Sequence, residues 1–113
     1  LKVNRKNAKY YSENLKDNPK IELINVNKKN NPSYWVYTVK VQNQKKFIEK
    51  MDKNNIMVSR VHERNDKHSC VFKYVTKLPN IDKMVEEMIC LPVGWWVTKK
   101  EIKKIVKIIN DGW

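Results

Sequence analysis

The feature that most constrains this chain is a central segment in which large apolar and smaller or polar side chains alternate. One set of alternating positions is aromatic or β-branched: Trp35, Tyr37, Val39 and Val41. A period of two with residues of this kind predicts a half-buried strand over 35–42. Helical periodicity on both sides of it predicts helices that cover the sheet. We therefore expect a small α/β (α+β) fold with about three or four strands flanked by helices.

The remaining strands are predicted from short apolar runs. Residues 20–26 alternate in the same way, 27–32 form a polar loop, and 56–61 continue from Ile56 as a strand. The run 89–91 is apolar and ends at Pro92, which cannot continue a sheet ladder.

Helices are predicted where apolar residues recur at helical spacing. Residues 7–15 read as one helix, and Asn43 caps a second that ends at Asn54. Residues 81–88 form a third with one apolar face, while the pattern over 66–77 is ambiguous and is compatible with one helical turn. Thr98 and Glu101 form a capping box for the last helix. Its core stripe is Ile102, Ile105, Val106 and Ile109.

The length of 113 residues indicates one domain. The chain begins at Leu1 with a helical pattern already under way, so we expect a piece of a longer protein. It has neither an apolar run long enough to span a bilayer nor a signal peptide, and a soluble, cytoplasmic protein is predicted. Cys70 and Cys90 stand in apolar contexts outside any CxxC motif, which predicts buried free thiols.

The net charge of +12 is compatible with binding to the phosphates of a nucleic acid. The positive residues are 21 Lys and only 3 Arg, and the lysines are spread along the whole chain. Sequence readout relies on the planar Arg guanidinium, so a solvated lysine surface is the better interpretation.

A polar cluster follows the apolar run 56–58. Its candidate site residues are Arg60, His62, Arg64, Asp66 and His68. Cationic groups at the exit of a strand suit one wall of a site for an anionic ligand.

Alternatives without a functional role stay open for the same residues. The histidines can be surface groups, and Arg60 or Arg64 can pair with Glu63 or Asp66 in weak surface bridges. A zinc site is not expected, because the cluster has too few donors at suitable spacing.

Five short motifs occur in order over nearly the whole chain. They comprise Arg5, Asn7, Ala8 and Tyr11; Ser33, Trp35 and Tyr37; Val61, His62, Arg64, Asn65 and Asp66; Leu91 to Gly94; and Gly112 with Trp113. This set resembles the C-terminal domain of the DegT/DnrJ/StrS-type sugar aminotransferases.

The resemblance implies a mostly antiparallel sheet, as in the small domain of fold type I aminotransferases. It also implies a pyridoxal 5'-phosphate enzyme that moves an amino group from an amino acid, usually glutamate, to a keto group of a nucleotide-linked sugar. The family works as a homodimer with active sites at the subunit interface.

The family's large N-terminal domain supplies the cofactor lysine and the phosphate cradle. Gly94 and Gly112 are the only glycines here, so no phosphate loop is visible. We therefore expect residues 1–113 to be a single C-terminal small domain that lacks the large cofactor-binding domain, binds no cofactor and is inactive alone.

Carried over to this chain, the resemblance assigns substrate binding to the polar cluster. His62 would point towards the substrate and donate to a phosphate or sugar hydroxyl. Arg60 and Arg64 would bind a pyrophosphate or the donor's carboxylate, Asp66 would orient one of these cations, and His68 would sit in the same wall.

The resemblance also predicts that aromatic residues pack at this domain's borders. Trp35 would pack under the polar wall. Trp95 and Trp96 are adjacent aromatic residues just before a capped helix, which favours their burial against the large domain or a second subunit; the alternative is an exposed aromatic platform for a sugar or a base. The alternative function is a stand-alone basic module that binds nucleic acid or another polyanion.

Overall fold

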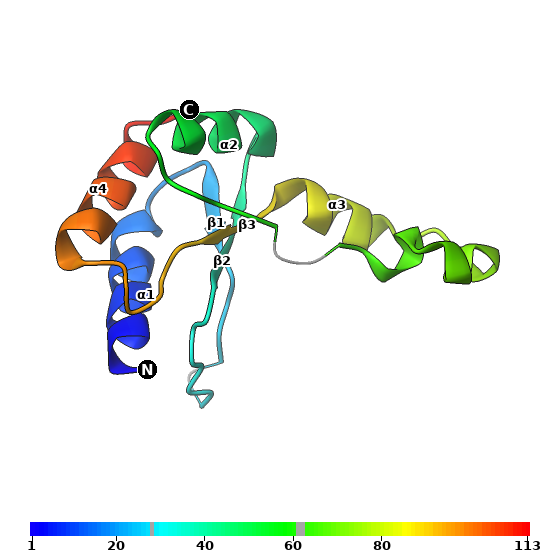
Figure 1. The fold of residues 1–113 in the computed structure, drawn as a ribbon, viewed down its shortest axis with the longest axis horizontal. Coiled ribbons are helices and arrows are strands. Elements are labelled where there is room, and N and C mark those ends of the chain that lie inside the picture. The colour runs from blue at the N-terminus through cyan, green and yellow to red at the C-terminus, as the bar shows by residue number, and fades with distance from the viewer. Residues whose placement is uncertain (28, 61–62) are drawn as a thin grey trace.

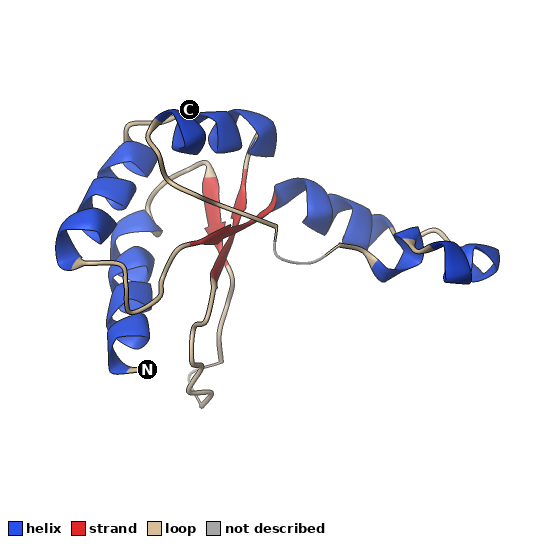
Figure 2. Cartoon of the chain, viewed as in Figure 1, coloured by secondary structure: helices blue, strands red, loops and turns tan. Residues whose placement is uncertain are grey.

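The computed structural model describes residues 1–27, 29–60 and 63–113. Three antiparallel strands form one sheet in the order β1 (Ile21–Leu23), β2 (Tyr37–Val41) and β3 (Met88–Leu91). The α-helices are α1 (Lys2–Leu15), α2 (Gln44–Lys53), α3 (Pro79–Glu87) and α4 (Lys99–Asn110), and two 3-10 helices are η1 (Asn65–Lys67) and η2 (Ser69–Tyr74). The predicted small, mostly antiparallel α+β fold is confirmed (Figure 2).

The core lies between the sheet and helices α1 and α4, which run side by side (Figure 1). Strand β2 is the middle strand and buries alternate side chains, Tyr37, Val39 and Val41, as the period of two predicts. Trp35 departs from the prediction: its side chain is 64% exposed. The ladder begins only at Tyr37, and Tyr34 has a positive φ of 52°, so the alternation of the strand does not extend back to Trp35.

Both predicted helix caps are present. The Asn43 side chain accepts a hydrogen bond from the Lys46 amide and begins α2. Thr98 and Glu101 form the reciprocal capping box at α4, with the Thr98 amide donating to Glu101 Oε2 at 2.7 Å. The α4 stripe predicted for the core is buried.

The strand predicted over 56–61 is not formed in its described part. Ile56 is buried and Met57 is 86% exposed, but only Ser59 pairs with the sheet, through an isolated bridge to Cys90. The chain crosses the edge of β3 rather than running along it, so one pair of backbone hydrogen bonds replaces a ladder. Val61 lies outside the described residues.

Residues 63–87 form an arm that projects away from the sheet (Figure 1). None of the residues in η1, η2 and α3 is buried. The radius of gyration is 15.3 Å, compared with about 13 Å for a compact chain of this length. The arm also corrects one prediction: Cys70 is exposed because η2 lies on it, whereas Cys90 on β3 is buried as expected.

The N-terminal motif ties α1 to the turn that follows β3. The Tyr11 hydroxyl donates to the Pro92 carbonyl at 2.8 Å, and Asn7 Nδ2 approaches the carbonyl oxygens of Val93, Gly94 and Val97 at 3.3, 3.3 and 3.1 Å. Two of the motifs that carry the resemblance therefore contact each other. Their role in this chain is to join α1 to the sheet.

Trp95 and Trp96 are 74% and 61% exposed, and their rings meet edge to face. Their burial against another domain or subunit stays a prediction. None of the helices in the described ranges has the length and apolar composition needed to cross a bilayer.

Candidate functional site

The polar cluster lies where the chain leaves the sheet and enters the arm. Arg60 comes directly after the Ser59 bridge; it is exposed and makes no hydrogen bond or ion pair with any part of the chain that the structure describes. His62, the predicted substrate contact, lies outside the described residues, so that prediction is not tested. The cluster continues on the arm with Arg64.

Arg64 is held by two carboxylates. Its Nε donates to Asp66 Oδ1 at 2.7 Å, and a second guanidinium nitrogen donates to Asp66 Oδ2, which makes the pair bidentate. The third nitrogen donates to Asp82 on α3. The side chains of Arg64 and Asp66 are only 13% and 18% exposed, while that of Asp82 is 56% exposed. Asp66 thus pairs with Arg64, which is also what the alternative of a plain ion pair predicts, and an orienting role of Asp66 in substrate binding stays a prediction.

This arrangement favours the charged forms of Arg64 and Asp66. The hydrogen bonds from Arg64 hold the pKa of the Asp66 carboxyl below its usual value, and the two carboxylates raise the pKa of the guanidinium. A bidentate Arg–carboxylate pair has fixed geometry, so it orients the local backbone as well as neutralising charge.

The sequence interpretation missed Asp82. The available signal was local: Pro79 is the first residue of α3, and an acidic residue in the first turn is favoured by the helix dipole. Nothing in the sequence indicates that this carboxylate faces Arg64, which lies 18 residues earlier.

His68 is exposed and stands at the junction of η1 and η2, where its amide donates to the Asn65 carbonyl at 3.3 Å. No hydrogen bond or ion pair links its side chain to Arg64 or Asp66 within the described residues. Of the five predicted site residues, the structure thus brings Arg64 and Asp66 together. Those described residues contain no group of three His, Cys, Asp or Glu side chains able to hold a metal ion.

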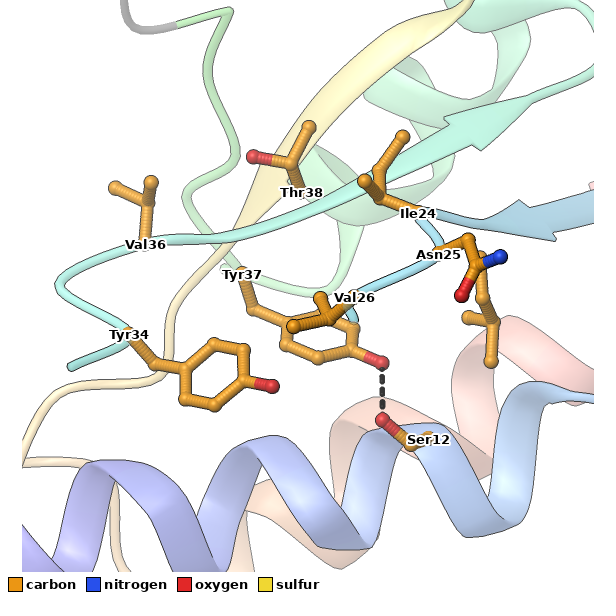
Figure 3. Close-up of a pocket in the computed structure, with 9 residues that line it drawn as sticks. Ser12, Ile24, Asn25, Val26, Tyr34, Val36, Tyr37 and Thr38 are labelled. Atoms are coloured by element: carbon orange, nitrogen blue, oxygen red, sulfur yellow. Dashed lines mark hydrogen bonds between the residues drawn. The ribbon is translucent and has the colours of Figure 1, made fainter. Parts of the chain in front are cut away.

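A pocket lies beside the hairpin formed by β1 and β2, apart from the polar cluster. Its volume is about 530 Å³, and it lies over α1 (Figure 3). Its lining is mixed, with apolar side chains and several hydroxyl groups: Ser12, Leu23, Ile24, Asn25, Val26, Tyr34, Val36, Tyr37 and Thr38. The sequence analysis did not predict this pocket, because its lining comes from three separate segments.

Hydrogen bonding within the pocket leaves the hydroxyl oxygen of Tyr37 available as an acceptor. Ser12 Oγ donates its single proton to the Ala8 carbonyl, so Tyr37 donates to Ser12 across 2.7 Å. Burial raises the pKa of Tyr37, which keeps the phenol protonated. The rings of Tyr34 and Tyr37 lie side by side with centroids 6.0 Å apart (Figure 3). This lining suits a group with an apolar face and a hydroxyl donor.

The residues that the structure describes do not fit the role of a pyridoxal-phosphate holder. A Schiff-base lysine requires a desolvated setting, and no lysine in the described ranges is buried. The two glycines do not form a phosphate loop either: Gly94 lies against the Trp96 ring, and Gly112 follows α4. No step of cofactor chemistry is therefore assigned to these residues.

The fold of this chain is similar to one part of solved sugar aminotransferases. The sugar aminotransferase CalS13 from Micromonospora echinospora is 33% identical, with a TM-score of 0.96 over 100% of this chain and 31% of that chain. AtS13 from Actinomadura melliaura is 39% identical, with a TM-score of 0.96 over 100% of this chain and 30% of that chain.

The family model of the DegT/DnrJ/EryC1/StrS aminotransferases matches residues 1–110, and the chain belongs to this family. Helicobacter pylori PseC, an aminotransferase involved in the biosynthesis of pseudoaminic acid, shares the fold at 17% identity, with a TM-score of 0.84 over 97% of this chain and 32% of that chain. The chain thus spans about 31% of the length of the solved structures it resembles. A comparison with curated protein sequences gave no match.

Proposed function

We propose that this chain is the C-terminal small domain of a pyridoxal-phosphate-dependent aminotransferase. The whole enzyme transfers an amino group from an amino acid, with glutamate as the expected donor, to a keto group of a nucleotide-linked sugar. The observation that carries the proposal is the family match over residues 1–110, together with 33% identity to the sugar aminotransferase CalS13 over the whole chain.

We propose that the cofactor is bound outside this chain, in the large domain, for two reasons. The relatives are about three times as long, and no described lysine here is buried. The large domain would therefore hold the cofactor, which supplies the electron sink for amino transfer. We expect the whole protein to be a cytoplasmic homodimer, and this chain to be inactive alone.

Within the site, we propose that Arg60, His62 and His68 contact the nucleotide sugar. Arg60 supports this role because it is exposed and has no partner among the described residues, so its guanidinium is available for a pyrophosphate. Arg64 is already committed to Asp66 and Asp82, which supports an indirect role for it and for Asp66.

The experiment that tests the function uses the full-length protein. We expect a visible absorbance band that borohydride abolishes, and glutamate-dependent amination of a nucleotide-linked keto sugar detected by mass spectrometry. A colourless full-length protein that aminates no such sugar would overturn the proposal.

Variants of the same protein test the site. Arg60→Gln should raise KM for the sugar roughly tenfold, as expected for loss of one charge-assisted contact. Lys107→Gln, which removes a positive charge from the exposed side of α4, is the matched control and should leave KM unchanged.

The alternative of a stand-alone polyanion-binding module is tested by the salt dependence of DNA and RNA binding. Phosphate contacts release counterions, so such a module would lose affinity steeply between low and physiological salt.

A further inference from the structure

We propose that Asp82 is a positioning residue for substrate binding, acting through Arg64. In this role it fixes residues 63–68, next to the groups that the proposed function places against the nucleotide sugar, so the inference rests on that function. Asp82 lies outside the motifs that carry the family resemblance; its assignment rests on the ion triad and on the way α3 is attached to the rest of the domain.

Helix α3 is attached to the body of the domain at its C-terminal end. Gln44, the first residue of α2, donates from Nε2 to the carbonyl oxygens of Val85 and Met88, at 3.0 and 2.7 Å. Met88 is already the first residue of β3. The C-terminal end of α3 is therefore anchored both by the sheet and by α2.

The other end of α3 is attached to Arg64, at the start of the arm. Asp82 belongs to the first turn of this helix and binds Arg64, which in turn grips Asp66 within η1. A helix is a stiff connector, so the position of the sheet is passed through α3 to Arg64. The triad thereby closes the base of the arm across 18 residues.

Apolar packing gives the arm little support. No residue of η1, η2 or α3 is buried, so apolar packing within the described chain contributes little to the position of residues 63–74. Chain segments of this kind open locally at low free-energy cost unless polar contacts hold them. The triad provides such a contact, and it is the more effective because Arg64 is largely shielded from water.

The charges of the triad separate positioning from direct binding. One guanidinium faces two carboxylates, so the triad itself carries a net charge of −1, and Lys67 beside Asp66 adds one positive charge. All three guanidinium nitrogens of Arg64 already donate to Asp66 or Asp82, so this side chain is poorly placed to bind a phosphate. Direct contact with an anionic substrate then falls to Arg60, whereas Arg64 acts as a strut. Removing Asp82 would loosen the strut without removing any group that touches the substrate.

The test uses the full-length enzyme with three variants. Asp82→Asn keeps the shape and removes the charge, Asp82→Glu keeps the charge, and Asp111→Asn is the matched control, since Asp111 is an exposed acid paired with Lys107 at 2.8 Å far from the arm. Steady-state kinetics give KM and kcat for both substrates. Limited trypsin digestion, with cleavage mapped by mass spectrometry, measures opening of the arm at Lys67 and Lys73.

We expect Asp82→Asn to raise KM for the sugar nucleotide roughly tenfold with kcat within about twofold of the wild type. Cleavage at Lys67 and Lys73 should accelerate, and Asp82→Glu should restore much of both properties. Asp111→Asn should match the wild type.

Two results would overturn the inference while leaving the proposed function intact: an active wild type in which Asp82→Asn behaves like Asp111→Asn, or faster cleavage with an unchanged KM. An inactive wild-type enzyme would instead refute the proposed function. The digestion would then still report whether the triad holds the arm.

Discussion

The buried amide of Asn7 offers the sharpest test of how this domain is held together. Asn7 is the one buried polar side chain among the described residues, at 6% exposure, and its Nδ2 group reaches three backbone carbonyls of the turn after β3. We predict that Asn7→Ala destabilises the domain by about 2–5 kcal/mol.

The magnitude follows from the number of donors and acceptors. The amide has two N–H groups; one faces Val97 at 3.1 Å, and the other is shared between Val93 and Gly94 at 3.3 Å each. Removing the amide leaves the buried carbonyls of Val93 and Val97 without this donor, whereas the Gly94 carbonyl keeps a hydrogen bond from the Val97 amide at 3.0 Å. Two unsatisfied carbonyls at about 1–3 kcal/mol each cost about 2–6 kcal/mol, and the gain in helix propensity from Asn to Ala offsets about 0.7 kcal/mol of this loss. Against a typical total stability of about 5–15 kcal/mol, such a loss is large.

A matched control lies on the same helix. Asn14 is exposed and donates to the Tyr10 carbonyl one turn earlier, at 2.8 Å. Asn14→Ala removes the same chemical group, gains the same helix propensity and leaves its acceptor in water, so we expect a change within about 0.5 kcal/mol.

The assay is urea unfolding followed by far-ultraviolet circular dichroism, with the free energy extrapolated to water for each variant. Asn7→Asp extends the test, because a carboxylate would face three carbonyl oxygens. Its pKa would be raised in the folded state, so this variant should lose further stability as pH rises above about 4. The reasoning is refuted if Asn7→Ala costs no more than Asn14→Ala.

Three further predictions concern the C-terminal third of the chain. Thr98→Ala should cost about 1 kcal/mol in the same unfolding assay. Hydrogen bonds from Thr98 lower the pKa of Glu101 in the folded state. The Glu101 carboxylate therefore stabilises the fold above its unfolded pKa, and this stabilisation is lost as pH falls through its folded pKa. The loss of stability caused by Thr98→Ala should thus be smaller at pH 3 than at pH 6. Gly94→Ala should displace the Trp96 ring, which a Cβ at that position would overlap, and a shift in tryptophan emission would detect it. Trp113→Ala should cost about 2–4 kcal/mol, since its indole donates to a backbone carbonyl at 2.8 Å and packs edge-on against a core ring; a loss below about 1 kcal/mol would contradict this.

Several elements were predictable because their signals are local. The strand around Val39 follows from a period of two, and the starts of α2 and α4 follow from caps at Asn43 and Thr98 that need only residues three positions away. The family was also predictable, because its short motifs occur in order along the chain.

Other predictions were wrong where the outcome depends on distant neighbours. Ile56 and the residues after it have strand-like composition, yet β3 offers them only one bridging position, at Ser59. Cys70 stands in an apolar context, but the arm carries it away from the core. The helical pattern around Ile81 was correct, although α3 buries none of its residues.

Local signals in the sequence specify the sheet's central strand and two capped helices, because periodicity and capping act over a few residues, and the ordered motifs identify the aminotransferase family. The contact of Asn7 with the turn after β3 and that of Asp82 with Arg64 depend on the tertiary structure. Those contacts join residues 90 and 18 positions apart, and no local pattern specifies which distant partner will satisfy a buried amide or a shielded guanidinium.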